Sequence, residues 1–191
     1  MELVFIRHGQ GQHTANLPES LNVVNPQLTK IGKNQAKSLR TSHPLTEKDA
    51  LIVSPSLRTL QTADVWSGNI ECLKIVHPLV APRIFPSRSE AVTLPCDELL
   101  GSERFLKEFP QFHVATNLTT TLWETGINVL PDDEFCRLAQ VLIDFCHNLK
   151  REKVYIVTHD GTITSYRQEL SGLVLTRDDF LEEVQSYRLL L

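Results

Sequence analysis

Short apolar runs, rich in β-branched and aromatic residues, alternate along the chain with longer stretches in which apolar residues recur at helical spacing. We expect strands at Glu2–Ile6, Leu51–Val53, Leu73–Val76, Val154–Thr158 and Val184–Leu190. Helices are expected between them, at about 29–42, 57–66, 102–109, 131–149 and 162–170. This alternation is typical of an α/β fold in which helices cover both faces of a mostly parallel sheet.

Two of these helices carry clear local signals. In the first, Thr29 is expected to be the N-cap. Ile31, Ala36 and Leu39 are expected to form its apolar stripe. The longest helix has acidic residues at 132–133, which suit the positive end of the helix dipole. Its apolar positions keep helical spacing and are Phe135, Leu138, Val141, Leu142 and Phe145.

The stretch from Pro78 to Pro131 follows neither pattern. It holds six of the ten prolines in the chain, and one short helix is expected in it, near Ser102–Phe109. We interpret this stretch as an irregular insertion that lies over the sheet as a lid. Because the chain has 191 residues and no internal repeats or linkers, we expect a single domain over residues 1–191.

Composition excludes several classes of function. A formal net charge of −4 provides no basic field for a nucleic acid or an anionic membrane. No apolar run approaches the ~20 residues of a transmembrane helix, and the apolar run at the N-terminus is too short for a signal peptide. The four cysteines have neither disulfide nor metal-ligand spacing. We therefore expect a cytoplasmic protein with reduced thiols and no bound metal.

Residues that could carry chemistry come directly after strands. Arg7–Gly9 follows the first strand, Ser54–Arg58 the second, and His159–Gly161 the strand at 154–158. The carboxyl ends of parallel strands lie at one edge of the sheet, so two arginines and two histidines would converge there. Cationic groups packed together repel one another, and a bound anion relieves the repulsion. A phosphoryl group suits such a site, because planar guanidinium groups and helix N-termini both bind its oxygens.

Four stretches of the chain resemble, in the family's order, motifs of the histidine phosphatase superfamily, in its phosphoglycerate-mutase-like branch. They are "FIRHGQ" around His8, "LTKIGKNQA" at the start of the first helix, "SPSLRTLQTA" around Arg58 and "IVTHDGTI" around His159. Together they cover residues 1 to about 165. The resemblance implies a three-layer α/β/α fold with a mostly parallel sheet, and an enzyme that needs no metal or other cofactor.

The resemblance also implies roles for the residues of these motifs. His8 would attack phosphorus through one ring nitrogen while the other donates to a backbone carbonyl. Arg7, Arg58 and His159 would hold the equatorial oxygens of the phosphoryl group. Thr14 stands where family members often have asparagine, and we expect its hydroxyl to bind a phosphate oxygen. Water would then hydrolyse the phosphohistidine.

The proton donor to the leaving group is the weak point of the resemblance. The family usually has a glutamate shortly after the third strand, whereas this chain has "PRIFP" at 82–86. Three carboxylates are candidates: Glu90, Asp97 and Asp160. Asp160 directly follows the second histidine, as the acid does in the acid-phosphatase branch. We favour Glu90, which lies on a loop able to fold over the site.

These inferences predict a metal-independent phosphatase that hydrolyses phosphate monoesters of a small metabolite through a phosphohistidine on His8. Two alternatives stay open: a phosphotransferase of the phosphoglycerate mutase type, and a catalytically idle phosphate-binding or interaction module. The short chain argues against a mutase, and the complete set of cationic residues argues against an idle module.

The partner is expected to be a small phosphorylated substrate, and neither a nucleic acid nor a membrane. The sequence does not identify that substrate, although Arg83 and Arg88 are candidates for holding an acidic group on it. Gln10 and His13 lie on the loop that follows the first strand and are candidates for contact with the substrate, although a surface position is the favoured interpretation for His13. The last strand, ending at Leu190, offers an edge through which a homodimer could form.

Overall fold

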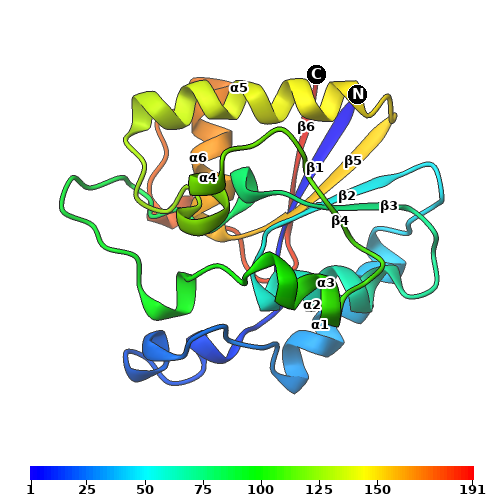
Figure 1. The fold of residues 1–191 in the computed structure, drawn as a ribbon, viewed down its shortest axis with the longest axis horizontal. Coiled ribbons are helices and arrows are strands. Elements are labelled where there is room, and N and C mark those ends of the chain that lie inside the picture. Colours follow the sequence, from blue (N-terminus) through cyan, green and yellow to red (C-terminus); the bar gives the residue numbers. More distant parts are fainter.

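The computed structural model describes residues 1–191 and consists of a six-stranded sheet between layers of helices (Figure 1). The order of the strands is β4-β3-β2-β5-β1-β6, and every neighbouring pair is parallel except β1 and β6. The strands are β1 (Glu2–Arg7), β2 (Ala50–Val53), β3 (Leu73–Val76), β4 (His113–Val114), β5 (Lys153–Thr158) and β6 (Ser186–Leu190). The predicted α/β class with a mostly parallel sheet is confirmed.

The main helices divide between the two faces of this sheet (Figure 1). Helices α1, α2 and α3 pack on one face, and α5 and α6 pack on the other. Their bounds are α1 (Lys30–Ser42), α2 (Leu57–Ser67), α3 (Ser102–Glu108), α4 (Thr120–Thr125), α5 (Asp132–Asn148) and α6 (Asp160–Ser171). The three-layer arrangement implied by the resemblance is therefore present.

Strand β1 shows why the strands are continuous apolar runs. Leu3 and Phe5 point into the core beneath α5 and α6, whereas Val4 and Ile6 point into the core beneath α1 and α2. All four side chains are buried. A strand that is covered on both faces has no position for a polar side chain until it reaches the edge of the sheet.

The expected cap of α1 is confirmed, whereas Ile31 of its expected apolar stripe and Val141 among the apolar positions of α5 are exposed. Thr29 accepts a hydrogen bond from a backbone N–H in the first turn. Ile31 is 57% exposed because it lies about 140° around the helix from the buried Ala36. Val141 of α5 is 45% exposed because it lies about 100° from the buried Leu142.

The insertion between β3 and α5 is mostly irregular, and it contains two 3₁₀ helices, η3 (Pro78–Val80) and η4 (Pro95–Asp97). It also contains α3, α4 and the two-residue strand β4. The sequence does not predict β4, because two residues are too few to form a pattern. Pairing of Ile75 with His113 extends the sheet there.

The last strand begins later than expected. Val184 has φ of 57°, in the left-handed region, and its N–H donates to Arg7 O. Strand β6 therefore starts at Ser186 and runs antiparallel to β1 at the edge of the sheet. Pairing of two copies through this edge stays a prediction. None of the helices is long and apolar enough to cross a membrane.

Candidate active site

Strands β1, β2 and β5 end side by side and carry the predicted residues to one edge of the sheet. In the register of β1 and β5, Arg7 lies opposite Thr158, so His8 and His159 are the next residues on neighbouring strands. Their ring centroids are 5.1 Å apart. The two histidines that are 151 positions apart in sequence therefore meet because of strand register alone.

His8 has the geometry of a neutral imidazole whose Nε2 carries the lone pair. Its Nδ1 donates to Gly9 O at 2.7 Å, which leaves Nε2 as the acceptor. Arg58 Nε donates to that Nε2 at 3.2 Å. Burial and then the charge of Arg58 lower the pKa of His8 well below its ordinary value. The ring is thus held in the tautomer that a nucleophile requires.

Arg58 lies in the first turn of α2 and is buried beneath the insertion. Its Nη1 donates to Cys96 O at 2.6 Å, and its Nη2 lies 2.9 Å from Asp97 Oδ1. The same Nη2 is 3.1 Å from Nδ1 of His159. One guanidinium group therefore contacts both histidines and is held in place by η4 of the insertion.

His159 is buried at the N-terminus of α6. Its Nε2 is 2.8 Å from the hydroxyl of Ser54, the first residue after β2. Burial, followed by the charge of Arg58, lowers the pKa of His159 well below its ordinary value. Burial and the charge of Arg58 therefore favour the neutral form of both histidines.

Arg7 reaches the same cavity from the end of β1. Its Nη2 forms an ion pair of 2.8 Å with Asp160 Oδ2, and its Nη1 donates to Leu181 O. The segment before β6 thus fixes one side of the guanidinium group. Thr14, the other predicted phosphate ligand, lines the cavity and donates its hydroxyl to Gly11 O at 3.0 Å. That hydroxyl must turn before it can donate to a phosphate.

His13 is a cavity residue, and its expected place on the surface is wrong. Its side chain is 9% exposed, and its ring centroid is 5.5 Å from that of His8. Neither ring nitrogen has a hydrogen-bond partner in the protein, and Nδ1 is sealed from solvent. A Cβ at Gly11 would lie 2.6 Å from that nitrogen, so glycine is needed for the ring to fit. Gly11 pairs with Leu28, which folds the loop inward. The buried position of His13 depends on this contact between distant parts of the sequence, so local sequence patterns do not predict it.

All three candidate proton donors line the same cavity, but their partners differ. Asp97 is bound to Arg58 and Asp160 to Arg7. Glu90 is exposed and has no hydrogen-bond or ion-pair partner in the protein. Burial raises the pKa of Asp97, although Arg58 opposes the shift. The structure therefore brings the three carboxylates together and leaves one of them without a cationic partner.

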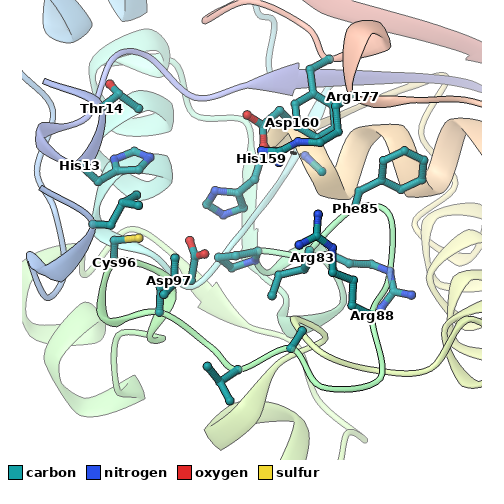
Figure 2. A pocket seen from close by; sticks show the side chains of 18 of the residues that line it. His13, Thr14, Arg83, Phe85, Arg88, Cys96, Asp97, His159, Asp160 and Arg177 are labelled. Carbon is teal, nitrogen blue, oxygen red and sulfur yellow. Dashed lines mark hydrogen bonds between the residues drawn. The ribbon is translucent and has the colours of Figure 1, made fainter. Parts of the chain in front are cut away.

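The cavity has a volume of about 880 Å³ and is walled by the loop after β1, the insertion and the segment before β6. Figure 2 shows His13 and Thr14 on one side of it, and Phe85 and Arg88 on the opposite side. Arg88 and Arg177 also line the cavity and have no carboxylate partner. The sequence did not single out Arg177, because it comes from a segment with no motif.

Arg83 lines the cavity, but both terminal nitrogens of its guanidinium group are bound to the protein. It is 4% exposed, donates to Leu130 O at 2.8 Å and pairs with Asp132 at 2.7 Å. Its Cζ lies 4.2 Å from the ring centroid of Phe135. Arg83 therefore ties the insertion to α5.

The residues present do not form a metal site. No group of three or more His, Cys, Asp or Glu side chains is close enough together to hold an ion. The four cysteines are unpaired.

Acid is expected to destabilise the protein through its buried histidines. Burial lowers the pKa of His13 and of His77 to about 3, and it also lowers the pKa of His8 and of His159 well below the ordinary value. Below the ordinary pKa of 6.5, the unfolded chain binds protons that the folded chain does not. The free energy of unfolding should therefore fall by up to about 1.4 kcal/mol per pH unit for each histidine.

Urea unfolding at several pH values on both sides of 6.5 measures this slope. The control is His77→Phe, because the His77 ring packs in the core with its centroid 4.8 Å from that of Phe145. In this variant, the dependence of the free energy of unfolding on pH should decrease by the contribution of one histidine only. A free energy of unfolding that does not change with pH would contradict the prediction.

Comparisons with known proteins agree with this geometry. Residues 3–79 match the model of the histidine phosphatase superfamily (branch 1). The matched part includes His8 and Arg58 and ends at the start of the insertion. The resemblance to this superfamily that the motifs indicate is therefore confirmed. No curated protein matches the chain in sequence.

Solved structures show the same fold. An alpha-ribazole phosphatase from Shigella flexneri has a TM-score of 0.59 at 18% identity, over 98% of this chain and 89% of its own. A phosphoserine phosphatase from Entamoeba histolytica has a TM-score of 0.58 at 18% identity, with the same coverage. An ecdysone phosphate phosphatase from Bombix mori, in complex with tungstate, has a TM-score of 0.58 at 15% identity, over 97% and 82%. At these identities the likeness concerns the fold.

Proposed function

We propose that this chain, which carries the histidine phosphatase pattern and fold, is a metal-independent phosphatase acting on phosphate monoesters through a phosphohistidine on His8. The observation that carries the proposal is the state of His8. Its Nδ1 is tied to Gly9 O, and its Nε2 lone pair faces the guanidinium group of Arg58. The neighbouring structures are named as phosphatases, which supports the class of reaction.

The reaction takes place in two displacements. In the first, Nε2 of His8 attacks phosphorus, the ester P–O bond breaks, and the leaving alkoxide takes a proton from a carboxylic acid. In the second, that carboxylate removes a proton from water, and the resulting hydroxide attacks phosphorus. The P–N bond breaks, inorganic phosphate leaves, and His8 is again neutral. Arg7, Arg58 and His159 stabilise the oxygens of the phosphoryl group in both steps.

Glu90 is the carboxylate that we propose as proton donor. Asp97 forms an ion pair with Arg58 and Asp160 forms one with Arg7, so an oxygen of each carboxylate is already occupied. Glu90 lies on the insertion, lines the cavity and is free to meet the leaving oxygen. Asp97 is the rival candidate, because burial raises its pKa.

Three variants separate the candidates. Glu90→Gln should lower kcat by about 10²–10⁴-fold on an alkyl phosphate, and less on 4-nitrophenyl phosphate, whose leaving group needs no proton. It should also abolish the alkaline limb of the pH–rate profile. Asp97→Asn and Asp160→Asn should keep that limb. If Asp97→Asn loses the limb and Glu90→Gln keeps it, Asp97 is the donor.

His13 is proposed as a further phosphate ligand, which becomes protonated when the anion arrives. A phosphate dianion beside a neutral imidazole raises the pKa of that imidazole. Binding of inorganic phosphate near neutral pH should therefore take up protons. Calorimetry in two buffers of different ionisation enthalpy measures the number. His13→Asn should reduce it, whereas His43→Asn, outside the cavity, should not. Equal uptake in His13→Asn and the unmodified protein would contradict this role.

Phosphate release from 4-nitrophenyl phosphate in the presence of a metal chelator tests the proposed function as a whole. The expected result is turnover that the chelator does not reduce, with inorganic phosphate as the product. Transfer of the phosphoryl group to an added phosphoglycerate instead of water would favour the mutase. Absence of turnover on every phosphate monoester would overturn the proposal.

A further inference from the structure

We infer that the preferred substrate is the phosphate monoester of an apolar alcohol, whose hydrocarbon part occupies the outer half of the cavity. The inference rests on the proposed phosphatase function and specifies its substrate class. It follows from the size of the cavity, from the apolar side chains that three segments of the chain contribute to its lining, and from the exposure of some of these side chains.

The cavity is much larger than a phosphoryl group requires. Its volume of about 880 Å³ lies near the upper end of the range for pockets that hold whole organic molecules. The groups proposed to bind phosphate gather at the inner end, around the rings of His8 and His159. The remaining space must hold the alcohol part of the substrate.

Nine of the 24 residues that line the cavity are hydrophobic. The apolar side chains come from three separate segments of the chain: the loop after β1, the insertion and the segment before β6. They include Leu17, Leu21, Phe85, Val92, Leu94 and Phe180. The rings of Phe85 and Phe180 pack with centroids 6.2 Å apart, which joins two of these segments.

Several of these side chains are exposed to an unusual degree. Val92 is 73% exposed, Leu17 is 61% exposed, and Leu94 is 39% exposed. A single exposed apolar side chain on a surface is ordinary, but a cluster around one cavity marks a binding site. Burying this cluster against hydrocarbon would lower the free energy of binding, whereas contact with a polar sugar or amino acid would not.

Arg88 and Arg177 favour a different class, a substrate with a second anionic group. Both line the cavity without a carboxylate partner, and Arg177 Cζ lies 5.6 Å from the ring centroid of Phe180. However, both side chains are exposed, so water already solvates their charges. Binding of a ligand therefore stabilises the complex more through the apolar side chains than through these arginines. A substrate with a second anionic group is the alternative that the test must distinguish.

The test is a series of primary alkyl phosphates, from ethyl to octyl, below their micelle concentrations. The leaving groups in the series have almost the same basicity, so differences in kcat/KM report contact with the alkyl chain. We expect kcat/KM to rise about two- to fourfold per methylene until the chain fills the cavity. Glycerol phosphate and a diphosphorylated alcohol, which carry hydroxyl or anionic groups instead, should stay near the ethyl ester.

Substitutions at the mouth of the cavity test whether the dependence of kcat/KM on alkyl chain length arises from contact with the cavity. Val92→Ser and Leu94→Ser change exposed positions, and each should lower kcat/KM for octyl phosphate about three- to tenfold more than for ethyl phosphate. The matched control is Val174→Ser, because Val174 is 93% exposed and lies outside the cavity. It should leave the dependence on chain length as it is.

The possible results are distinguishable. Equal kcat/KM across the alkyl series, or a clear preference for the diphosphorylated alcohol, would overturn the apolar substrate class while the phosphatase activity stands. A dependence on chain length that Val92→Ser and Leu94→Ser do not change would place the hydrocarbon elsewhere and would also overturn the inference. No release of phosphate from any ester would overturn the proposed function itself.

Discussion

His8→Ala is expected to lower kcat on any phosphate monoester by roughly 10⁴-fold or more, because the substitution removes the atom that forms the covalent intermediate. The His8 ring is buried, and the protein contacts it through Gly9 O and Arg58 Nε. Loss of an imidazole that contributes only to packing would change stability and not turnover. Steady-state kinetics and urea unfolding of the same preparation separate these two effects.

His13→Ala is the matched control for this variant. His13 is a buried histidine of the same cavity, and its ring centroid lies 5.5 Å from that of His8. The His13→Ala variant should lose about 10–100-fold in kcat/KM, the range for a side chain that stabilises charge without forming a covalent bond. If His8→Ala and His13→Ala lose activity equally, His8 is not the nucleophile.

Arg58→Lys is expected to lower kcat/KM by about 10²–10⁴-fold although it keeps the positive charge. Arg58 contacts Nε2 of His8 through its Nε, and both Nδ1 of His159 and the carboxylate of Asp97 through its Nη2. A lysine ammonium group is a single point charge and cannot reproduce this planar set of donors. The loss should appear mainly in kcat, since the charge on phosphorus oxygens is greatest in the transition state.

Arg40→Lys is the control for that substitution. Arg40 also donates to backbone carbonyls, those of Val65 and Trp66, but it lies outside the cavity. It should lower the free energy of unfolding by about 1 kcal/mol and leave kcat unchanged. Full activity of Arg58→Lys would show that charge alone suffices, which contradicts the role that the geometry gives to the guanidinium group.

The sequence predicts the elements that depend on local patterns. Strand β3 and helix α2 lie at or within one residue of their expected bounds, because buried apolar runs and helix starts are marked by neighbouring residues. The convergence of His8, Arg58 and His159 was also predictable. It follows from one topological rule, that the ends of parallel strands meet at one edge.

The surroundings of those residues were not predictable, because they depend on contacts distant in sequence. Asp97 reaches Arg58 only because the irregular insertion folds back over α2. Arg83 forms an ion pair with Asp132, which lies 49 positions away in the sequence. The inward position of His13 depends on the pairing of Gly11 with Leu28. Neither apolar periodicity nor turn residues indicate such contacts.

Trapping of a phosphoryl-enzyme is the most direct test of a phosphohistidine on His8. The protein is mixed with a ³²P-labelled monoester, quenched in alkali within one turnover, and digested for mass spectrometry. We expect label on the peptide that contains His8, stable in alkali and lost in acid, and no label in His8→Ala. Label that survives acid, label on another residue, or equal labelling of His8→Ala would contradict a phosphohistidine on His8.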